Sequence, residues 1–250
     1  MMMKTIIMPI AYLGELTLLL IQTFSFIFQR AVNLRLTVQQ MALIGVNSLP
    51  IVLLTTAFTG MVISLQVAHE AVRFGGGKLV GGLVAVAMAR ELAPVLTGVV
   101  VAGRAGSAIC AELGSMKVTE QIDALRAMAT NPIQYLVVPR FLSCLIMLPV
   151  LTIFADIIGI LGGYFIAVHF AGINPVAYYD SICTFLKLVE VFDGLIKSAI
   201  FGVIISLVGC LQGLNTTGGA AGVGRSTTNS VVICIILIFA ANFFLSMLMF

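Results

Sequence analysis

Arg90 and Glu91 are two adjacent charged residues inside a stretch, Leu79 to Gly103, that is otherwise uncharged. If this stretch crosses a membrane, a charge at the bilayer centre costs about 2.5–3.5 kcal/mol, so the pair should face a cavity or polar partners. Successive residues point about 100° apart on a helix and need not pair with each other. Two interpretations stay open: a polar contact to a substrate head group or a gating network, and a structural ion network between helices.

A second group of charges, between residues 119 and 128, predicts a short amphipathic helix. Thr119 can cap its start, and Asn131-Pro132 stops it. The acidic and basic residues are ordered to suit the helix dipole, and one face is apolar: Glu120, Asp123 and Arg126 carry the charges, and Ile122, Leu125 and Met128 form the apolar stripe. Such a helix suits docking to a cytoplasmic partner, and it equally suits a solvated linker that rests on the membrane.

Other patterns that could do chemistry are rejected. The segment from Gly219 to Ser226 fits a phosphate-binding loop except that Arg225 stands where lysine is required, and it lies between two apolar stretches rather than after a buried strand. We expect a flexible glycine-rich turn there. His69 and His169 are isolated, so no metal site is indicated. We therefore expect no catalytic residue, no metal and no cofactor bound by this chain.

Composition explains where these residues must sit. The chain of 250 residues is 60% hydrophobic and 9% charged, with a mean hydropathy of +1.16. A soluble domain is roughly 25% charged, so this is an integral membrane protein and not a soluble enzyme. The net charge of +3 gives no support for nucleic-acid binding. Five dispersed cysteines form no C-x-x-C pair, and they are interpreted as apolar packing residues.

Five stretches are long and apolar enough to cross a bilayer, which takes about 20 residues. They lie near residues 44–68, 79–103, 141–168, 198–214 and 226–250. Asp156 interrupts the third, and we expect it to be structural and paired with a neighbouring helix. The segment Tyr12 to Phe28 is apolar but includes Glu15 and Gln22. It predicts an amphipathic helix lying in the interface, with a sixth span as the alternative.

Lysine and arginine counts in the loops set the orientation. One side holds eight of them, namely Lys4, Arg30, Arg35, Arg104, Lys117, Arg126, Arg140 and Arg225. The other side holds four, namely Arg73, Lys78, Lys187 and Lys197. The side with eight should be cytoplasmic. The N-terminus is then cytoplasmic, and five spans place the C-terminus outside.

The residues that identify a family are spread along the chain. They are Ala89–Pro94, Ala102–Ala108 and Ala111–Leu125, continued by Asn131-Pro132, Pro139–Phe141 and Gly222–Thr228, with Val231-Val232, Gly60–Val62 and Leu65-Gln66. This pattern resembles the MlaE/YrbE permease family over residues 45 to 250. Ala93 replaces a glycine that is common before the proline. The first 40 residues carry no diagnostic match, and we divide the chain into an interfacial helix with its connector (1–40) and a permease transmembrane domain (41–250).

The resemblance implies an all-α integral membrane protein with an N-terminal interfacial helix, five transmembrane helices and a cytoplasmic coupling helix between spans 2 and 3. It implies a homodimer in the bacterial inner membrane that moves phospholipids and maintains outer-membrane lipid asymmetry. Expected partners are two copies of a cytoplasmic ABC ATPase, which uses the ATP, and a periplasmic MCE-domain protein, with a STAS-domain protein as an additional candidate.

The resemblance also assigns roles to residues. Arg90, Glu91 and Gln66 are expected to line the lipid cavity. The residues expected to couple to the ATPase are Glu112, Glu120, Gln121, Asp123, Leu125 and Arg126. The alternative class is a secondary transporter or channel without an ATPase. Those proteins often show internal repeats, and this chain shows none. A third class is a structural scaffold with no lipid in the cavity.

Overall fold

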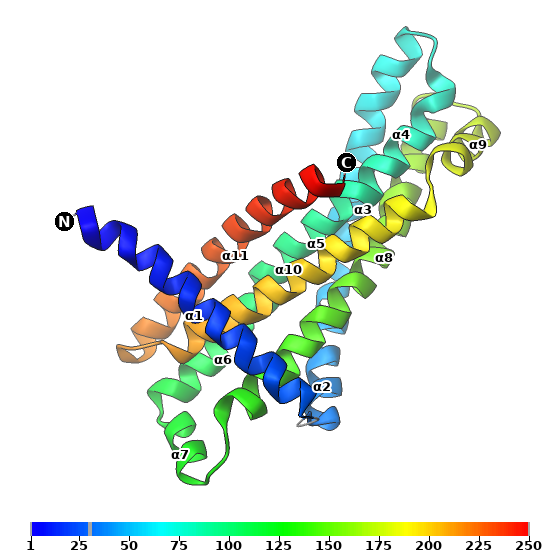
Figure 1. Cartoon of the computed structure of the whole chain (residues 1–250). Coiled ribbons are helices and arrows are strands. Elements are labelled where there is room, and N and C mark those ends of the chain that lie inside the picture. Colours follow the sequence, from blue (N-terminus) through cyan, green and yellow to red (C-terminus); the bar gives the residue numbers. More distant parts are fainter. Residues whose placement is uncertain (1, 30–31, 250) are drawn as a thin grey trace.

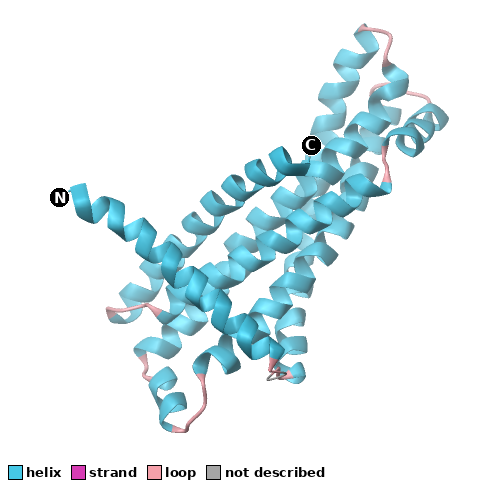
Figure 2. Ribbon diagram, in the orientation of Figure 1, coloured by secondary structure: helices cyan, strands magenta, loops and turns pink. Residues whose placement is uncertain are grey.

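The computed structural model describes residues 2–29 and 32–249, with side chains from residue 11 onward. All regular elements in these ranges are helices (Figure 2), which confirms the all-α fold class. In chain order they are α1 (Met2–Phe28), α2 (Leu34–Met41), η1 (Ala42–Val46), α3 (Asn47–Arg73), η2 (Gly77–Leu79), α4 (Val80–Ala87), η3 (Met88–Leu92), α5 (Ala93–Val101), η4 (Ala102–Gly106), α6 (Ser107–Val118), α7 (Gln121–Ala127), η5 (Ile133–Val137), α8 (Val138–His169), α9 (Pro175–Phe185), α10 (Leu188–Leu214) and α11 (Gly219–Met249).

Several elements join end to end into helices longer than the predicted spans. Residues 34–73, 77–118 and 133–169 each form one apolar helix, alongside α10 and α11. Four π-helical turns interrupt them: η1, η3, η4 and η5. The division expected at residue 40 falls inside the first of these helices. The sequence prediction used the roughly 20 residues that cross a bilayer, whereas these helices are longer and extend beyond the bilayer.

The long helices form one elongated bundle with two distinct ends (Figure 1). One end holds α7 and α2, and we call it the α7 end. The opposite end holds α9 and the turn between α3 and α4, and we call it the α9 end. α10 begins at Leu188 and not near residue 198, so much of the expected outer loop is helical.

Close backbone contact between α3 and α8 forms the centre of the bundle. A Cβ atom at Gly60 would lie 2.0 Å from the carbonyl oxygen of Gly159, and one at Gly162 would lie 2.6 Å from that of Ala57. The Ser64 hydroxyl donates to the carbonyl of Gly163 at 2.7 Å. Small residues are what allow membrane helices to approach this closely.

The segment predicted as a flexible glycine-rich turn is instead the start of α11. Gly218 and Gly219 have positive φ angles and make the turn, and the helix runs on from Gly219 through Ser226. Gly222 packs so closely that a Cβ atom there would lie 1.8 Å from the carbonyl oxygen of Thr217. The prediction of a flexible turn was wrong because only Gly218 and Gly219 adopt positive φ angles. Gly222 is helical, and its lack of a side chain lets α11 pack against Thr217.

α1 lies across the α7 end of the bundle. It is apolar enough from Ala11 to Phe28 to cross a membrane by length and composition. Its side-chain contacts nevertheless lie at the α7 end of the bundle. The Tyr12 hydroxyl accepts from Gln212 at 3.2 Å near the end of α10. The Phe24 ring packs edge-on against Phe141 near the start of α8, with centroids 5.6 Å apart. Figure 1 shows α1 crossing the long helices rather than running beside them.

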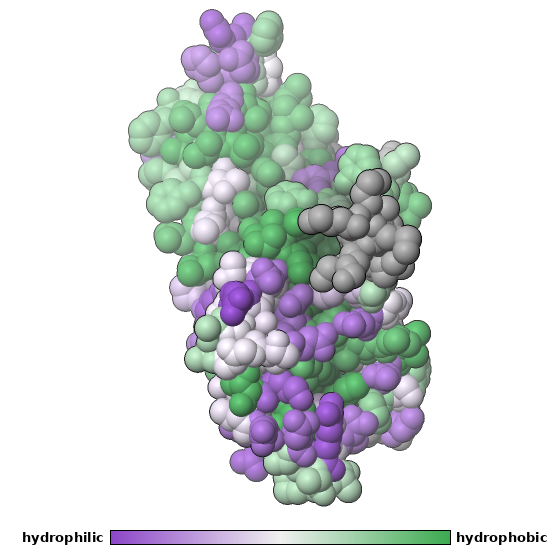
Figure 3. Space-filling model, turned by 90° about the vertical axis from the view of Figure 1, so that its left-hand side faces the viewer, coloured by the Kyte–Doolittle hydropathy of each residue, from purple (hydrophilic) through white to green (hydrophobic). Residues whose placement is uncertain are grey.

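The outer surface fits a membrane environment. Large exposed apolar side chains follow each long helix, including Phe58 on α3, Phe154 on α8 and Phe239 on α11. On the face seen in Figure 3, apolar surface covers the upper part, while polar surface gathers at the lower end and at the tip. The chain is therefore a multi-pass membrane protein. Arg30 and the Lys4 side chain, which entered the orientation estimate, lie outside the described residues.

The position of α1 predicts how deep its residues lie in a bilayer. Nitroxide labels at the exposed positions Leu13 and Ile21 are separated by about 12 Å along the helix axis. If α1 lies in the interface, both labels should report nearly the same depth in a depth-quenching measurement. Labels at Val232 and Phe239 on α11 are the control and should differ by about 10 Å. A depth difference of about 12 Å between the two α1 labels would show that α1 crosses the membrane.

Candidate functional site

Arg90 and Glu91 lie on the π-helical turn η3, directly before Pro94. A proline has no N–H and clashes with the carbonyl four residues earlier, which here is that of Arg90. The freed carbonyl accepts a hydrogen bond from the Lys197 ammonium of α10 at 3.0 Å. The wider turn and the proline together present both charged side chains to neighbouring helices.

The Glu91 carboxylate is the centre of a polar network that joins three helices. Its Oε1 accepts from Lys197 Nζ at 2.5 Å and from the Ser246 hydroxyl at 2.7 Å. Its Oε2 accepts from the Asn242 amide at 2.8 Å. Lys197 is fully buried and also donates to Ser246 at 2.9 Å. A buried ammonium of this kind is tolerated only with such acceptors around it.

Arg90 makes a separate ion pair with Glu190 in the first turn of α10. Its Nη2 donates to Glu190 Oε1 at 2.9 Å, and its Nε donates to Oε2, so the pair is bidentate. Planar bidentate pairing is the strongest geometry available to an arginine.

The network lies near one end of the spanning helices. Lys197 is the tenth residue of α10, and Ser246 is within one turn of the last residue of α11, Met249. The side chains of Arg90 and Glu91 remain 35% and 37% exposed. The pair thus forms the ion network that one interpretation expected, and it also keeps an open surface toward the α9 end.

The sequence did not identify the partners of this pair. Lys197 and Glu190 were assigned to an outer loop because the apolar window began at residue 198. Asn242 and Ser246 are polar residues spaced four apart in the apolar part of α11, and that spacing was the available signal. The structure does not bring Gln66 to this network: it is exposed on α3 and lines a shallow hollow of about 470 Å³ with Val67 and Phe74.

The short helix predicted between residues 119 and 128 is present as α7, at the opposite end of the same long helix. It covers Gln121–Ala127. Thr119 does not cap it, because its hydroxyl donates back to the carbonyl of Ser115 at 2.8 Å and so belongs to the end of α6. Glu120 precedes α7 with a left-handed backbone, φ 60°. The sharp reversal between α6 and α7 needs that conformation, which places Glu120 and not Thr119 at the cap position.

The side chains of α7 divide into a seated face and an open face. Ile122 is fully buried and Leu125 packs against the core, while Met128 is 67% exposed and lies outside the buried stripe. Asp123 accepts from Lys117 at 3.2 Å and from Arg126 at 3.0 Å. Glu120 and Gln121 are exposed. The exposed residues leave this face available to a partner.

Glu112 lies apart from α7, on α6. Its carboxylate pairs with Arg140 of α8 at 2.7 Å, and the Arg140 side chain is 5% exposed. Arg140 also donates to the carbonyl of Leu136 at 2.7 Å. The pair therefore ties α6 to α8 within the chain, while the Glu112 side chain keeps 54% of its surface exposed.

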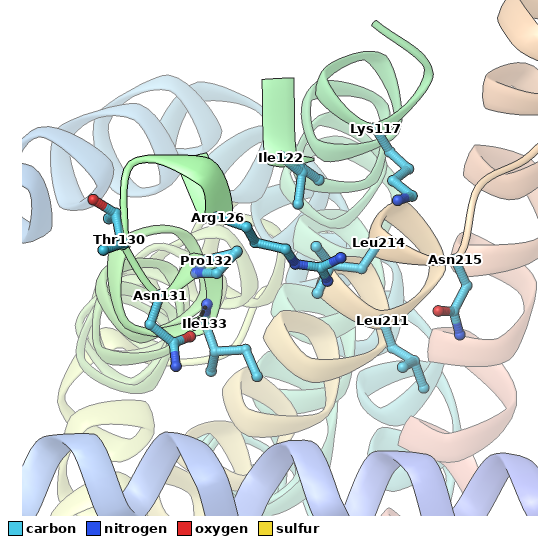
Figure 4. Close-up of a pocket in the computed structure, with 11 residues that line it drawn as sticks. Lys117, Ile122, Arg126, Thr130, Asn131, Pro132, Ile133, Leu211, Leu214 and Asn215 are labelled. Carbon is cyan, nitrogen blue, oxygen red and sulfur yellow. Dashed lines mark hydrogen bonds between the residues drawn. The ribbon is translucent and has the colours of Figure 1, made fainter. Parts of the chain in front are cut away.

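A cleft of about 580 Å³ lies behind α7. Figure 4 shows its walls: Lys117 and Ile122 on one side, the Asn131–Ile133 segment on another, and Leu211, Leu214 and Asn215 from the end of α10. The Arg126 guanidinium points toward Leu214 in this view. α7 is thus only partly packed onto the bundle.

Within the described residues, Asp156 does not make the contact with a neighbouring helix that the sequence predicted. It is 7% exposed on α8, and neither carboxylate oxygen has a hydrogen-bond partner among the described residues. The pairing with a neighbouring helix predicted from sequence is therefore wrong within the described part of the chain, because no polar side chain of another helix reaches either carboxylate oxygen. Among the described residues no His, Cys, Asp and Glu cluster could hold a metal.

Comparisons with a protein family and with individual proteins both point to permeases. The family described as "Permease MlaE" matches residues 37–248. A Synechocystis protein named as a probable ABC transporter permease is 50% identical over 229 residues, covering 92% of this chain and 87% of that protein. A similarly named Rickettsia typhi protein is 42% identical over 226 residues, covering 90% and 87%. Protein TRIGALACTOSYLDIACYLGLYCEROL 1 of Arabidopsis thaliana is 42% identical over 220 residues, covering 88% and 63%.

The Glu91–Lys197 pair makes a testable contribution to stability. Replacing one member of a buried ion pair leaves the other uncompensated and costs about 3–5 kcal/mol. We expect Glu91→Gln to lower the melting temperature of the purified chain in detergent. Adding Lys197→Met should restore part of the loss, with a coupling energy of about 1–3 kcal/mol.

The exposed pair Glu70 and Arg73, at 3.7 Å on α3, is the matched control and should give a coupling near zero. Strictly additive effects of Glu91→Gln and Lys197→Met would contradict an energetic link between the two side chains.

Proposed function

The chain belongs to the MlaE permease family, whose members are ABC transporter permease subunits, and on this premise we propose that it moves phospholipids between the inner membrane and an MCE-domain partner. The observation that carries the proposal is that one continuous helix, residues 77–118, bears the Glu91 network near one end and leads into α7 at the other. A transporter driven by a separate motor needs such a rigid link between a substrate site and a docking helix.

The α9-side end of this helix suits an amphiphilic substrate. Arg90 and Glu91 offer charge and hydrogen bonds beside the exposed apolar side chains of α11, such as Phe239 and Phe243. A phospholipid has a charged head group and apolar tails that match these two kinds of surface. The Arabidopsis relative is named after a galactolipid, which supports a lipid substrate.

The α7 end suits a motor. α7 presents Glu120, Gln121 and Asp123 outward, whereas Arg126 lines the cleft behind it, and its apolar side is seated through Ile122 and Leu125. We assign α7 as the coupling helix that docks in a groove of a cytoplasmic ABC ATPase. Two copies of the chain would bind two ATPases, and ATP would be bound and used by those partners. Glu112, through Arg140, would hold α6 to α8 when α7 is pushed.

The proposed orientation puts the α7 end in the cytoplasm and the α9 end in the periplasm of a bacterial cell. The N-terminus is then cytoplasmic and the C-terminus periplasmic, and Ser246 near the end of α11 belongs to the Glu91 network. An MCE-domain protein would receive or deliver lipid at the α9 end, and a STAS-domain protein would associate with the ATPase. The overall process would maintain outer-membrane lipid asymmetry. ABC permease membership argues against the rival class of secondary transporter or channel.

In the proposed mechanism, the π-helical turns are the places where the long helix can change shape. Along the chain, a displacement of α7 reaches Arg90 and Glu91 through α6, η4, α5 and η3. π-Helical turns are local departures from regular winding that often occur at functional sites. ATP-driven closure of the two ATPases would shift this helix, alter the Glu91 network and change the shape of a cavity between two copies of the chain.

The substrate role of Arg90 predicts a selective loss of transport. Arg90→Gln should lower ATP-dependent phospholipid transfer in proteoliposomes by about tenfold, the effect of losing a charge-assisted hydrogen bond. Copurification of the ATPase should be unchanged. Arg73→Gln, an exposed arginine at the α9 end, is the control and should transfer lipid normally. If Arg90→Gln instead prevents assembly, Arg90 is a structural residue only.

The coupling role of α7 predicts a loss of communication with the motor. Reversing charge with the double substitution Glu120→Lys and Asp123→Lys should reduce lipid transfer per ATP hydrolysed by at least about fivefold, within the usual range of coupling energies. Glu70→Lys, also an exposed acidic residue but at the α9 end, should have no effect. Unchanged coupling in the α7 variant, with ATPase still bound, would refute this role.

A further inference from the structure

The cleft behind α7 has a basic wall that the proposed coupling role does not use. Lys117 and Arg126 both line it, and both pair with one carboxylate, that of Asp123. Two cations against one carboxylate leave a net charge of +1. Each of the two makes a single hydrogen bond to Asp123. An arginine has five N–H donors, so Arg126 keeps donors beyond its bond to Asp123, and its guanidinium points toward Leu214 across the cleft (Figure 4). No acidic residue is among the lining residues in the described part of the chain.

The remaining walls of the cleft are apolar or neutral. Ile122 is fully buried at its inner edge, and the aliphatic lining is completed by Ile133, Leu211 and Leu214. Asn131 and Asn215 add neutral amides. An inorganic anion needs only the cations, whereas this combination of a basic wall with an apolar floor matches an anion that carries a hydrocarbon part.

The cleft opens at the level where α1 crosses the bundle. Asn215 lines the cleft and also donates to the Glu15 carboxylate of α1 at 3.0 Å. The Glu15 carboxylate is the nearest acidic neighbour from α1, and this hydrogen bond orients it toward Asn215. Leu13, Leu18 and Ile21 are exposed along α1. A lipid whose head group enters the cleft could therefore rest its tails on the exposed apolar surface of α1 within the bilayer.

We propose that this cleft binds the phosphate of an anionic phospholipid from the leaflet at the α7 end. Arg126 and Lys117 bind the phosphate, Asn131 and Asn215 supply further hydrogen bonds, and the tails lie along α1. Basic pockets at the membrane face between helices are known to suit anionic head groups. The bound lipid is a resident and not the transported molecule, so the inference requires only that the chain is embedded in a membrane.

Such a lipid would bridge α7 and the end of α10. α7 is seated mainly through Ile122 and Leu125, and a phosphate held by Arg126 would add a second attachment. The position of the docking helix would then depend on the anionic lipid content of the leaflet. This consequence is separate from recognition of a substrate at Glu91, which lies toward the other end of the same helix.

Native mass spectrometry of the purified, delipidated full chain tests the proposal. The probes are short-chain phosphatidylglycerol, which is anionic, and phosphatidylcholine of equal chain length, which is zwitterionic. We expect the wild-type chain to bind phosphatidylglycerol preferentially. The double substitution Lys117→Gln and Arg126→Gln should weaken that binding by about tenfold, the effect of losing charged hydrogen bonds. Arg73→Gln is the matched control, because Arg73 is also an exposed arginine paired three residues away, and it should bind normally.

A second variant distinguishes loss of the binding site from misfolding, because it is expected to bind the lipid more tightly. Asp123→Asn removes the carboxylate that competes for both cations, so it should strengthen phosphatidylglycerol binding severalfold. Excess inorganic phosphate should displace the lipid poorly, because it lacks tails. Equal binding of the two lipids, no change in either cleft variant, or full displacement by phosphate would overturn the proposal. Displacement of the lipid when the ATPase binds would also overturn it, by assigning the cleft to the partner protein.

Discussion

A fully buried ammonium group, that of Lys197, sets the arrangement of the α9-side half of the bundle. In an apolar environment it is stable only where acceptors surround it, and Glu91, the Arg90 carbonyl and Ser246 supply them. Each acceptor has a structural requirement. Pro94 frees the Arg90 carbonyl, η3 directs the Glu91 side chain, and the C-terminal turn of α11 brings Ser246 into range. Three helices must therefore meet at one point for a single charge to be buried.

The α7 end and the α9 end of the bundle are linked because one long helix runs between them. Residues 77–118 carry Arg90 and Glu91 and lead directly into α7. Two further basic residues secure this helix near the α7 end. Arg104 donates to the Leu43 carbonyl at 3.2 Å and to Ser48 at 3.1 Å, and Arg140 pairs with Glu112 at 2.7 Å. Both attachments adjoin π-helical turns, so the helix is held by side chains where its own winding is irregular.

Sequence reasoning identified features that depend on local pattern. The apolar stretches, α7 and the unusual pair at Arg90 and Glu91 all follow from composition and spacing, and the family assignment is confirmed by the comparisons. Features that depend on tertiary contact were missed. Lys197 was placed in a loop because an apolar window excludes the charge that the fold buries. Thr119 was taken as a cap because the left-handed turn at Glu120 leaves no trace in residue type. Asp156 was given a partner on a neighbouring helix, and the described residues supply none.

We propose that lipid is handled where the Glu91 network opens beside α11 and that ATP drives the change there. A photoreactive residue at Phe243, which is exposed and next to Asn242, tests it in the reconstituted complex. The account predicts a phospholipid adduct whose yield changes with ATP, while the same probe at Phe58 on α3, also exposed, gives an adduct that ATP does not alter. Equal, ATP-independent labelling at both positions would contradict it, because Phe243 would then face only bulk membrane.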